Sequence, residues 1–309
     1  MMPAKPLPPK SPKPKRLERP KRVTIAAGLV CVDGIIMCAD TQETISGLTK
    51  NNVCKFKFWR DEGLWVVITG AGDTELIETA SQLVIEALRG DYTLGSCWFS
   101  KELSHRIQDA VMAFFNTSLL PYPKDERPFV DLLIGISIHN ERCEYETLFK
   151  ASGTTVREID PGEGSLGAEC LGLGLILAKS LIERLYGPFL NLDELLLTAA
   201  FIIFQAKRFV DGCGGETDLV ILSKHICRTV PRRDIAQLEK YFQKFDEWTG
   251  DLVHQFSNIT ISDTKIRTEL RRRQKYILEL RQELFKADLD VFKILKEIKE
   301  HRERPSTTS

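Results

Sequence analysis

A chain of 309 residues with 43% apolar residues can bury a large core, as one large domain or two ordinary ones. Lys plus Arg and Asp plus Glu both total 43, so overall charge favours neither nucleic acid nor a membrane surface as partner. The eight cysteines form no Cys-x-x-Cys pair and the five histidines are dispersed. This pattern predicts no cofactor, no metal site, and a cytoplasmic protein with reduced thiols. No apolar run reaches membrane-spanning length.

The first 22 residues differ in composition from the rest of the chain. They contain seven prolines and carry a local net charge of +7, with Glu18 as the single acid. Such a segment cannot bury enough apolar surface to fold, so we expect a disordered basic leader. A solubilising or removable tail is the favoured interpretation, and a basic arm for nucleic acid or another acidic partner is the alternative.

Strand patterns follow the leader. Val23–Val32 and Ile35–Ala39 are apolar runs joined by Asp33-Gly34, a strong hairpin signal. Phe56–Trp59 and Leu64–Ile68 predict a second strand pair, after a polar connection. The glycine-rich sequence TGAGD then predicts a turn into a helix, with its aspartate or the next threonine as cap.

Pairs of helices and pairs of strands alternate through the following 150 residues. The expected elements are helices from about 74 to 88 and Ser100–Leu119, strands Phe129–Ile138 and Tyr145–Lys150, helices Leu175–Tyr186 and Leu192–Val210, and strands Leu219–Leu222 and Ile226–Val230. This order predicts an α+β fold, a four-layer α/β/β/α sandwich in which two central sheets are each covered by a helix pair.

The composition becomes charged and helical from Arg232 onward. Apolar residues recur every seven positions, at Leu270, Ile277, Leu284, Val291 and Ile298. This heptad pattern predicts one long C-terminal helix, packed either on its own domain or as a coiled coil with a partner copy. We therefore expect a leader at 1–22, a domain at 23–231 and a helical extension at 232–309.

Four residues in this order, Thr24, Asp40, Lys55 and Gly70, carry a resemblance to a known family. The chain resembles proteasome-type subunits and the related bacterial peptidase of the heat-shock two-component protease, which are N-terminal nucleophile hydrolases. The resemblance runs through VDGIIMCADTQ, TISGLTKNNVCKF, TGAGD, the Gly-Leu-Gly turn at 172–174 and AKRFVDGCGGETDLVIL. It implies homo-oligomeric rings or rings of related subunits that degrade peptides or unfolded proteins, with an ATPase partner left open.

The resemblance also implies roles for these four residues. Thr24, exposed as the first residue after leader removal, would attack a peptide carbonyl with its own α-amine as base. Lys55 would lower the pKa of the nucleophilic centre, and Asp40 would orient that lysine. Gly70 would offer a backbone N–H to the developing oxyanion.

Other positions match the family pattern only in part. Asp211 is similar to the aspartate beside the nucleophile, although displaced by one residue, and Cys213 stands where a supporting serine is usual. Val23 precedes Thr24 at the position where self-processing precursors have glycine. If the first loop carries an insertion, Val23 itself aligns with the first residue of the mature chain, and no nucleophile is present. Leu173 replaces a serine that bonds the nucleophile's amine in active members.

Three functions are therefore open at the level of sequence. The first is a threonine-type endopeptidase of proteasome type that acts after removal of the leader. The second is a non-catalytic ring or scaffold subunit, in which the leader and the C-terminal helix mediate assembly. The third is an amidohydrolase acting on a small molecule with the same nucleophile, since a fold does not determine a substrate.

Overall fold

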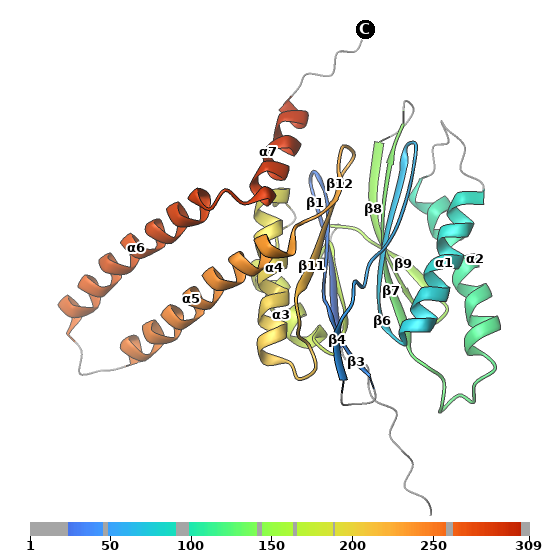
Figure 1. Cartoon of the computed structure of the whole chain (residues 1–309), viewed down its shortest axis with the longest axis horizontal. Helices are drawn as coiled ribbons and strands as arrows, with labels where there is room; N and C mark the ends of the chain where they lie inside the picture. Colours follow the sequence, from blue (N-terminus) through green and yellow to red (C-terminus); the bar gives the residue numbers. More distant parts are fainter. Residues whose placement is uncertain are drawn as a thin grey trace, which may run out of the picture.

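The computed structural model describes residues 24–45, 49–90, 99–140, 144–162, 166–187, 189–257 and 262–303. Within these ranges the chain is a mixed α/β protein with two five-stranded antiparallel sheets and seven α-helices (Figure 1). None of the helices in the described ranges is long and apolar enough to cross a membrane. The predicted leader and Val23 lie outside the described residues.

The first sheet contains the predicted N-terminal hairpin. Its strand order is β10 (Ala168–Gly172), β1 (Ile25–Cys31), β2 (Gly34–Asp40), β11 (Thr217–Leu222) and β12 (Cys227–Thr229). Every residue of β1 and β2 is buried, because both faces of this sheet are covered. Continuous apolar runs, with no polar alternation, are the pattern expected of such strands.

The second sheet has the order β5 (Lys57–Asp61), β6 (Leu64–Gly72), β7 (Val130–His139), β8 (Glu144–Ser152) and β9 (Thr155–Ile159). The predicted glycine turn after residue 69 is the end of β6 in the structure. A separate hairpin of β3 (Gln42–Ile45) and β4 (Thr49–Asn52) occupies the stretch predicted to be a polar connection. Strands β9 and β10 were not predicted either.

The described chain has seven α-helices, most of which cover the outer faces of the sheets. They are α1 (Thr74–Gly90), α2 (Ser100–Phe114, continuing as a π-helix to Leu119), α3 (Leu175–Leu185), α4 (Leu192–Phe209), α5 (Arg232–Ser257), α6 (Asp263–Lys286) and α7 (Asp290–Glu303). One apolar cluster joins α1 and α2 to the second sheet, another lies between the sheets, and a third joins α3, α4, α5 and α7 to the first sheet. The chain after residue 231 therefore contributes to the same core.

The prediction of one long C-terminal helix is wrong, because α6 and α7 are separate helices. Asp288 between them has φ 45°, a left-handed conformation that ends α6. The buried carboxylate of Asp234 accepts the backbone N–H of Val291 at 2.8 Å and so caps α7. Val291 is buried in the core, whereas Leu270 and Ile277 on α6 are 40% and 42% exposed. The heptad pattern is thus divided between two environments.

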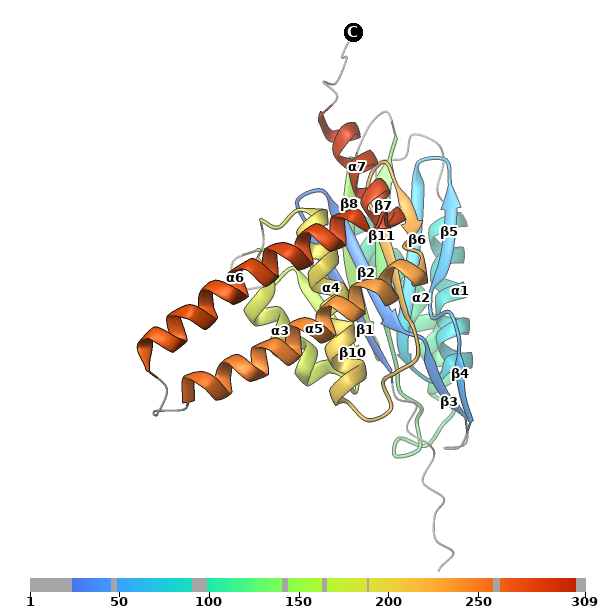
Figure 2. The same cartoon turned by 60° about the vertical axis from the view of Figure 1, so that its left-hand side comes forward.

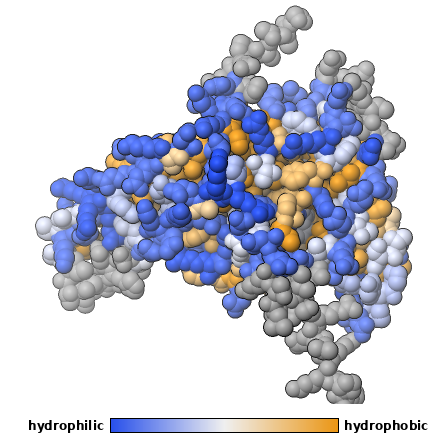
Figure 3. Space-filling view, viewed as in Figure 1, coloured by the Kyte–Doolittle hydropathy of each residue, from blue (hydrophilic) through white to orange (hydrophobic). Residues whose placement is uncertain are grey.

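Helices α5 and α6 lie side by side and extend away from the sheets as an arm (Figures 1 and 2). Arg273 of α6 connects the two helices of the arm. Its guanidinium donates to the carbonyl of Trp248 on α5 at 2.9 Å and lies over the ring of that residue. Most of the arm surface is hydrophilic in the view of Figure 3. A continuous coiled-coil seam along both C-terminal helices is therefore absent from the described chain.

Candidate active site

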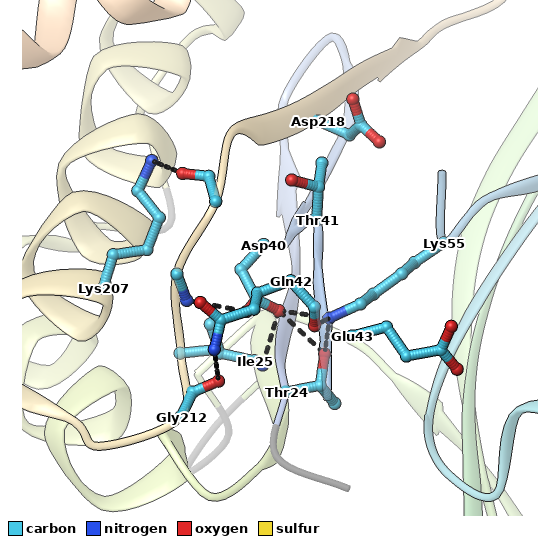
Figure 4. Close-up of polar contacts among 12 residues, drawn as sticks. Thr24, Ile25, Asp40, Thr41, Gln42, Glu43, Lys55, Lys207, Gly212 and Asp218 are labelled. Carbon is cyan, nitrogen blue, oxygen red and sulfur yellow. Dashed lines mark hydrogen bonds and ion pairs between the residues drawn. The ribbon is translucent and has the colours of Figure 1, made fainter. Parts of the chain in front are cut away.

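The first hairpin brings Thr24 and Asp40 together. Thr24 precedes β1, and Asp40 ends β2, where continuation of the β1–β2 register places Ile25 opposite Asp40. The Thr24 hydroxyl donates to Asp40 Oδ1 at 2.8 Å. Lys55 Nζ, arriving from the segment between β4 and β5, donates to the same carboxylate oxygen at 2.6 Å and also to the Thr24 hydroxyl (Figure 4). The structure therefore brings together the three residues that the sequence order indicated.

Asp40 is the centre of this network. Its carboxylate is fully buried, and it also accepts the backbone N–H of Ile25 at 3.1 Å and that of Gly214 at 3.0 Å. A buried carboxylate is unfavourable unless donors and a counter-ion replace water. Here both oxygens are satisfied, and Lys55, with 13% of its side chain exposed, supplies the positive charge. The position of the Lys55 ammonium group is thereby fixed beside the Thr24 hydroxyl.

Gln42 is a residue of the site that the sequence did not indicate. Its carbonyl accepts a third bond from Lys55 Nζ at 2.9 Å, and its side-chain amide donates to the carbonyl of Gly212 at 2.9 Å. Its backbone N–H donates to the carbonyl of Gly214. A Cβ added to Gly214 would lie 2.4 Å from the side-chain amide oxygen of Gln42, so the two residues are closely packed. Gln42 thus connects Lys55 to the glycine turn that donates to Asp40.

Gly70, the predicted oxyanion donor, lies near the end of β6 and lines the space beside Thr24. Hydrogen-bonded pairs alternate with non-bonded pairs along an antiparallel ladder. Gly63 and Asp73, at the two ends of the β6–β7 ladder, are both hydrogen-bonded to the β7 side, so the bonded pairs fall at the odd-numbered residues of β6. The N–H of Gly70 is therefore directed away from β7, toward the β5 side. There β5 begins at Lys57, opposite Ile68, so the described ladder supplies Gly70 with no partner.

The two candidates on the turn after α4 differ in position. Asp211 is exposed, and the hydrogen bonds among Thr24, Asp40 and Lys55 in the described chain do not include it. Cys213 is buried close to this network. The pKa of its thiol is raised to about 12, mainly by burial and also by the charge of Asp40, while the charge of Lys55 opposes the shift. The thiol therefore stays protonated at neutral pH and packs against the network.

The turn between β10 and α3 holds the main chain of Thr24. Leu173 donates its backbone N–H to the Thr24 carbonyl at 3.0 Å, while its side chain is 51% exposed. Gly172 has φ 89°, and a Cβ at this position would lie 2.0 Å from the same carbonyl oxygen. The turn therefore fixes Thr24 through backbone contacts, without a side-chain hydroxyl.

A pocket of about 120 Å³ opens beside Thr24. Its walls come from β3, the segment before β5, the end of β6 and the first turns of α1, and its lining residues are Thr24, Gln42, Glu43, Val53, Cys54, Lys55, Lys57, Gly70, Gly72, Thr74, Ile77, Glu78 and Ser81. The volume is smaller than the roughly 300 Å³ at which drug-sized ligand sites begin. One amino-acid side chain is a suitable occupant. The described residues contain no group of three or more His, Cys, Asp or Glu able to hold a metal ion.

Comparison with solved structures finds the same fold in Anbu proteins. An Anbu (Gly-1) mutant from Hyphomicrobium sp. strain MC1 is 19% identical, covering 78% of this chain and 99% of its own, with a TM-score of 0.59. Anbu (ancestral beta-subunit) from Yersinia bercovieri is 16% identical, covering 76% and 97%, with a TM-score of 0.58. Anbu in the helical assembly of the Anbu complex from Pseudomonas aeruginosa is 13% identical, covering 75% and 96%, with a TM-score of 0.62.

No family model and no curated protein sequence matches the chain. At these identities the structural likeness shows the fold alone. The identification as a proteasome-type subunit, or as the bacterial heat-shock peptidase, is wrong, because the similar structures are Anbu proteins, a distinct proteasome-related family. The chain therefore has the fold of Anbu.

Proposed function

We propose that this chain is a threonine-type peptidase in which Thr24 becomes the first residue of the mature protein. The observation that carries the proposal is the Thr24–Asp40–Lys55 network at the edge of a pocket. Two sheets between helix pairs support a four-layer α/β/β/α sandwich of N-terminal nucleophile type. The proposal also includes a leader at 1–22, a hydrolase domain at 23–231 and a helical extension at 232–309. It places the protein in the cytoplasm.

The proposed reaction is acyl transfer through Thr24. Its Oγ1 attacks the peptide carbonyl while the freed α-amine of the same residue accepts the hydroxyl proton. Lys55, oriented by Asp40, favours the developing alkoxide by its charge. The N–H of Gly70 bonds the oxyanion as the tetrahedral intermediate forms. The amine of the product leaves with the proton, and water then hydrolyses the ester and restores the threonine.

The pocket volume supports a peptide substrate over a small amide. A space that accepts one side chain selects a residue of an extended chain, whereas a small-molecule site encloses most of its ligand. The non-catalytic alternative has one observation in its favour. Leu173 offers no hydroxyl to an α-amine at Thr24, so this amine has fewer hydrogen-bond partners than a serine at position 173 would supply.

Peptide hydrolysis by wild-type protein and two Thr24 variants tests the proposal. Thr24→Ala removes the nucleophile, and we expect hydrolysis of fluorogenic peptides to fall on the order of 10⁴-fold. Thr24→Ser retains a hydroxyl that can donate to Asp40 and should keep measurable activity. Equal rates for the wild-type protein and the alanine variant would contradict the proposal.

We further propose that copies of the chain associate with one another, as Anbu does in the helical assembly from Pseudomonas aeruginosa. The apolar side chains exposed on α6, Leu270 and Ile277 among them, are suited to such a contact. The double variant L270E/I277E should shift the mass measured by light scattering toward one chain. Lys275→Glu, an exposed change on the same helix, is the control. An unchanged mass in the double variant would remove α6 from the interface.

A further inference from the structure

The glycine turn at 212–216, which leads into β11, is packed against the end of β2 and the residue that follows it. Gly214 donates its backbone N–H to Asp40 Oδ2 at 3.0 Å. The backbone N–H of Glu216 donates to the Thr41 hydroxyl at 2.8 Å, and the carbonyl of Glu216 accepts the N–H of Thr41 at 2.9 Å. The position of the Asp40 carboxylate therefore depends on the position of this turn.

Side chains of α4 and α5 contact the glycine turn and the strand that follows it. Lys207 of α4 donates to the carbonyl of Gly215 at 3.2 Å (Figure 4) and pairs with Glu239 of α5 at 2.5 Å. Thr217, the first residue of β11 and the partner of Asp40 in the β2–β11 register, donates its hydroxyl to the same oxygen of Glu239 at 2.8 Å. One carboxylate oxygen on α5 therefore connects the turn to the start of β11.

Burial makes this carboxylate difficult to replace by water. The side chains of Lys207 and Glu239 are only 10% and 20% exposed. A buried ammonium group that loses its counter-ion moves toward solvent or takes up water. Without Glu239, the bond to Gly215 is the one hydrogen bond left to Lys207 within the part of the chain that the structure describes. Loss of Glu239 should therefore loosen both the glycine turn and the start of β11.

We propose that Glu239 is a positioning residue of the candidate active site. It holds the glycine turn, and the turn fixes the Asp40 carboxylate. Asp40 orients Lys55 beside Thr24, and Glu239 itself does not line the pocket, so it acts through Asp40 and not on the substrate. Since α5 belongs to the helical extension at 232–309, this extension contributes to the site. The inference rests on the proposed peptidase function.

Asp246 supplies a matched control on the same helix. Its side chain is also 20% exposed. One of its oxygens also accepts two donors, the amide of Gln205 at 2.6 Å and the guanidinium of Arg208 at 2.9 Å, both on α4. These contacts do not include the glycine turn or β11. Asp246→Ala therefore removes an α4–α5 contact, as Glu239→Ala does, and leaves the turn in place.

Steady-state hydrolysis of a fluorogenic peptide measures the effect of each variant. We expect Glu239→Ala to lower kcat about tenfold, because the nucleophile and its lysine are less well aligned, and to change KM less than about twofold, because the pocket is untouched. Asp246→Ala should keep the wild-type kcat. Glu239→Gln retains an oxygen that can accept both donors, so it should keep kcat within about threefold of the wild-type value.

Hydrogen–deuterium exchange followed by mass spectrometry gives a second measurement that needs no catalysis. The hydrogen bonds that the glycine turn donates toward β2 protect its amides from exchange. We expect a fragment spanning 210–218 to exchange about tenfold faster in Glu239→Ala and at the wild-type rate in Asp246→Ala. A fragment spanning 25–31 in β1 should exchange at one rate in all three proteins, which separates local opening of the turn from a general loss of stability.

The two measurements separate the outcomes. A lower kcat and faster exchange at 210–218, both confined to Glu239→Ala, support the inference. Wild-type exchange or a wild-type kcat in Glu239→Ala, or an equal fall in kcat in both alanine variants, would overturn it. If the wild-type protein hydrolyses no peptide, the proposed peptidase function fails, and the exchange rates alone then decide whether Glu239 holds the glycine turn.

Discussion

Asp40→Asn is expected to lower peptide hydrolysis on the order of 10³-fold and the free energy of unfolding by about 3 kcal/mol. The carboxylate accepts hydrogen bonds at both oxygens, from Thr24, Ile25 and Lys55 at one and from Gly214 at the other. An asparagine amide has one accepting end, so one set of donors loses its partner. Lys55 also loses its counter-ion while its side chain stays mostly buried.

Urea unfolding together with peptide hydrolysis measures both effects. Glu144→Gln is the control, because Glu144 pairs with Lys224 where both side chains are about half exposed. Loss of such a surface pair should change the free energy of unfolding by at most about 0.5 kcal/mol. A similar small change in Asp40→Asn, with hydrolysis retained, would mean that Asp40 neither anchors Lys55 nor supports the reaction.

Gly172→Ala is expected to lower the free energy of unfolding by about 3 kcal/mol and to abolish hydrolysis. The new Cβ would stand 2.0 Å from the Thr24 carbonyl oxygen, in a backbone conformation of φ 89° that side chains rarely adopt. The β10–α3 turn must move, and its backbone hydrogen bond from Leu173 to Thr24 is then lost. The start of β1 loses the support that positions the nucleophile.

Gly153→Ala separates the steric effect from backbone strain. Gly153 also has a positive φ, of 60°, but nothing lies within 4 Å of a Cβ built there. We expect this control to lower the free energy of unfolding by about 1 kcal/mol, from strain alone, and to leave hydrolysis intact. Equal effects of the two substitutions in urea unfolding would show that the contact with Thr24 contributes nothing.

The sequence predicted the part of the fold and site that depends on local signals. The Asp33-Gly34 turn and two apolar runs predicted the β1–β2 hairpin, and this hairpin sets Asp40 beside Thr24. Lys55 was predicted as a site residue because it follows Thr24 and Asp40 in the order found in proteasome-type subunits. The structure places it in the same network, although the family identification itself was wrong.

Features that depend on distant contacts could not be predicted from local pattern. Strand β3 is polar and short, and Gln42 within it acts through Gly212, 170 residues away in the chain. The break between α6 and α7 depends on the carboxylate of Asp234, 57 residues before Val291. The heptad repeat continues across that break without a glycine or proline to indicate it.

Mass spectrometry after treatment with a peptide β-lactone tests whether Thr24 is an N-terminal nucleophile. Attack by the Thr24 hydroxyl opens the lactone and leaves an ester, so the adduct carries the whole mass of the reagent. We expect a chain that begins at Thr24 and bears one adduct on that residue, and we expect no adduct in Thr24→Ala. A chain that keeps Val23 bonded to Thr24, or an adduct that persists in the alanine variant, would contradict it.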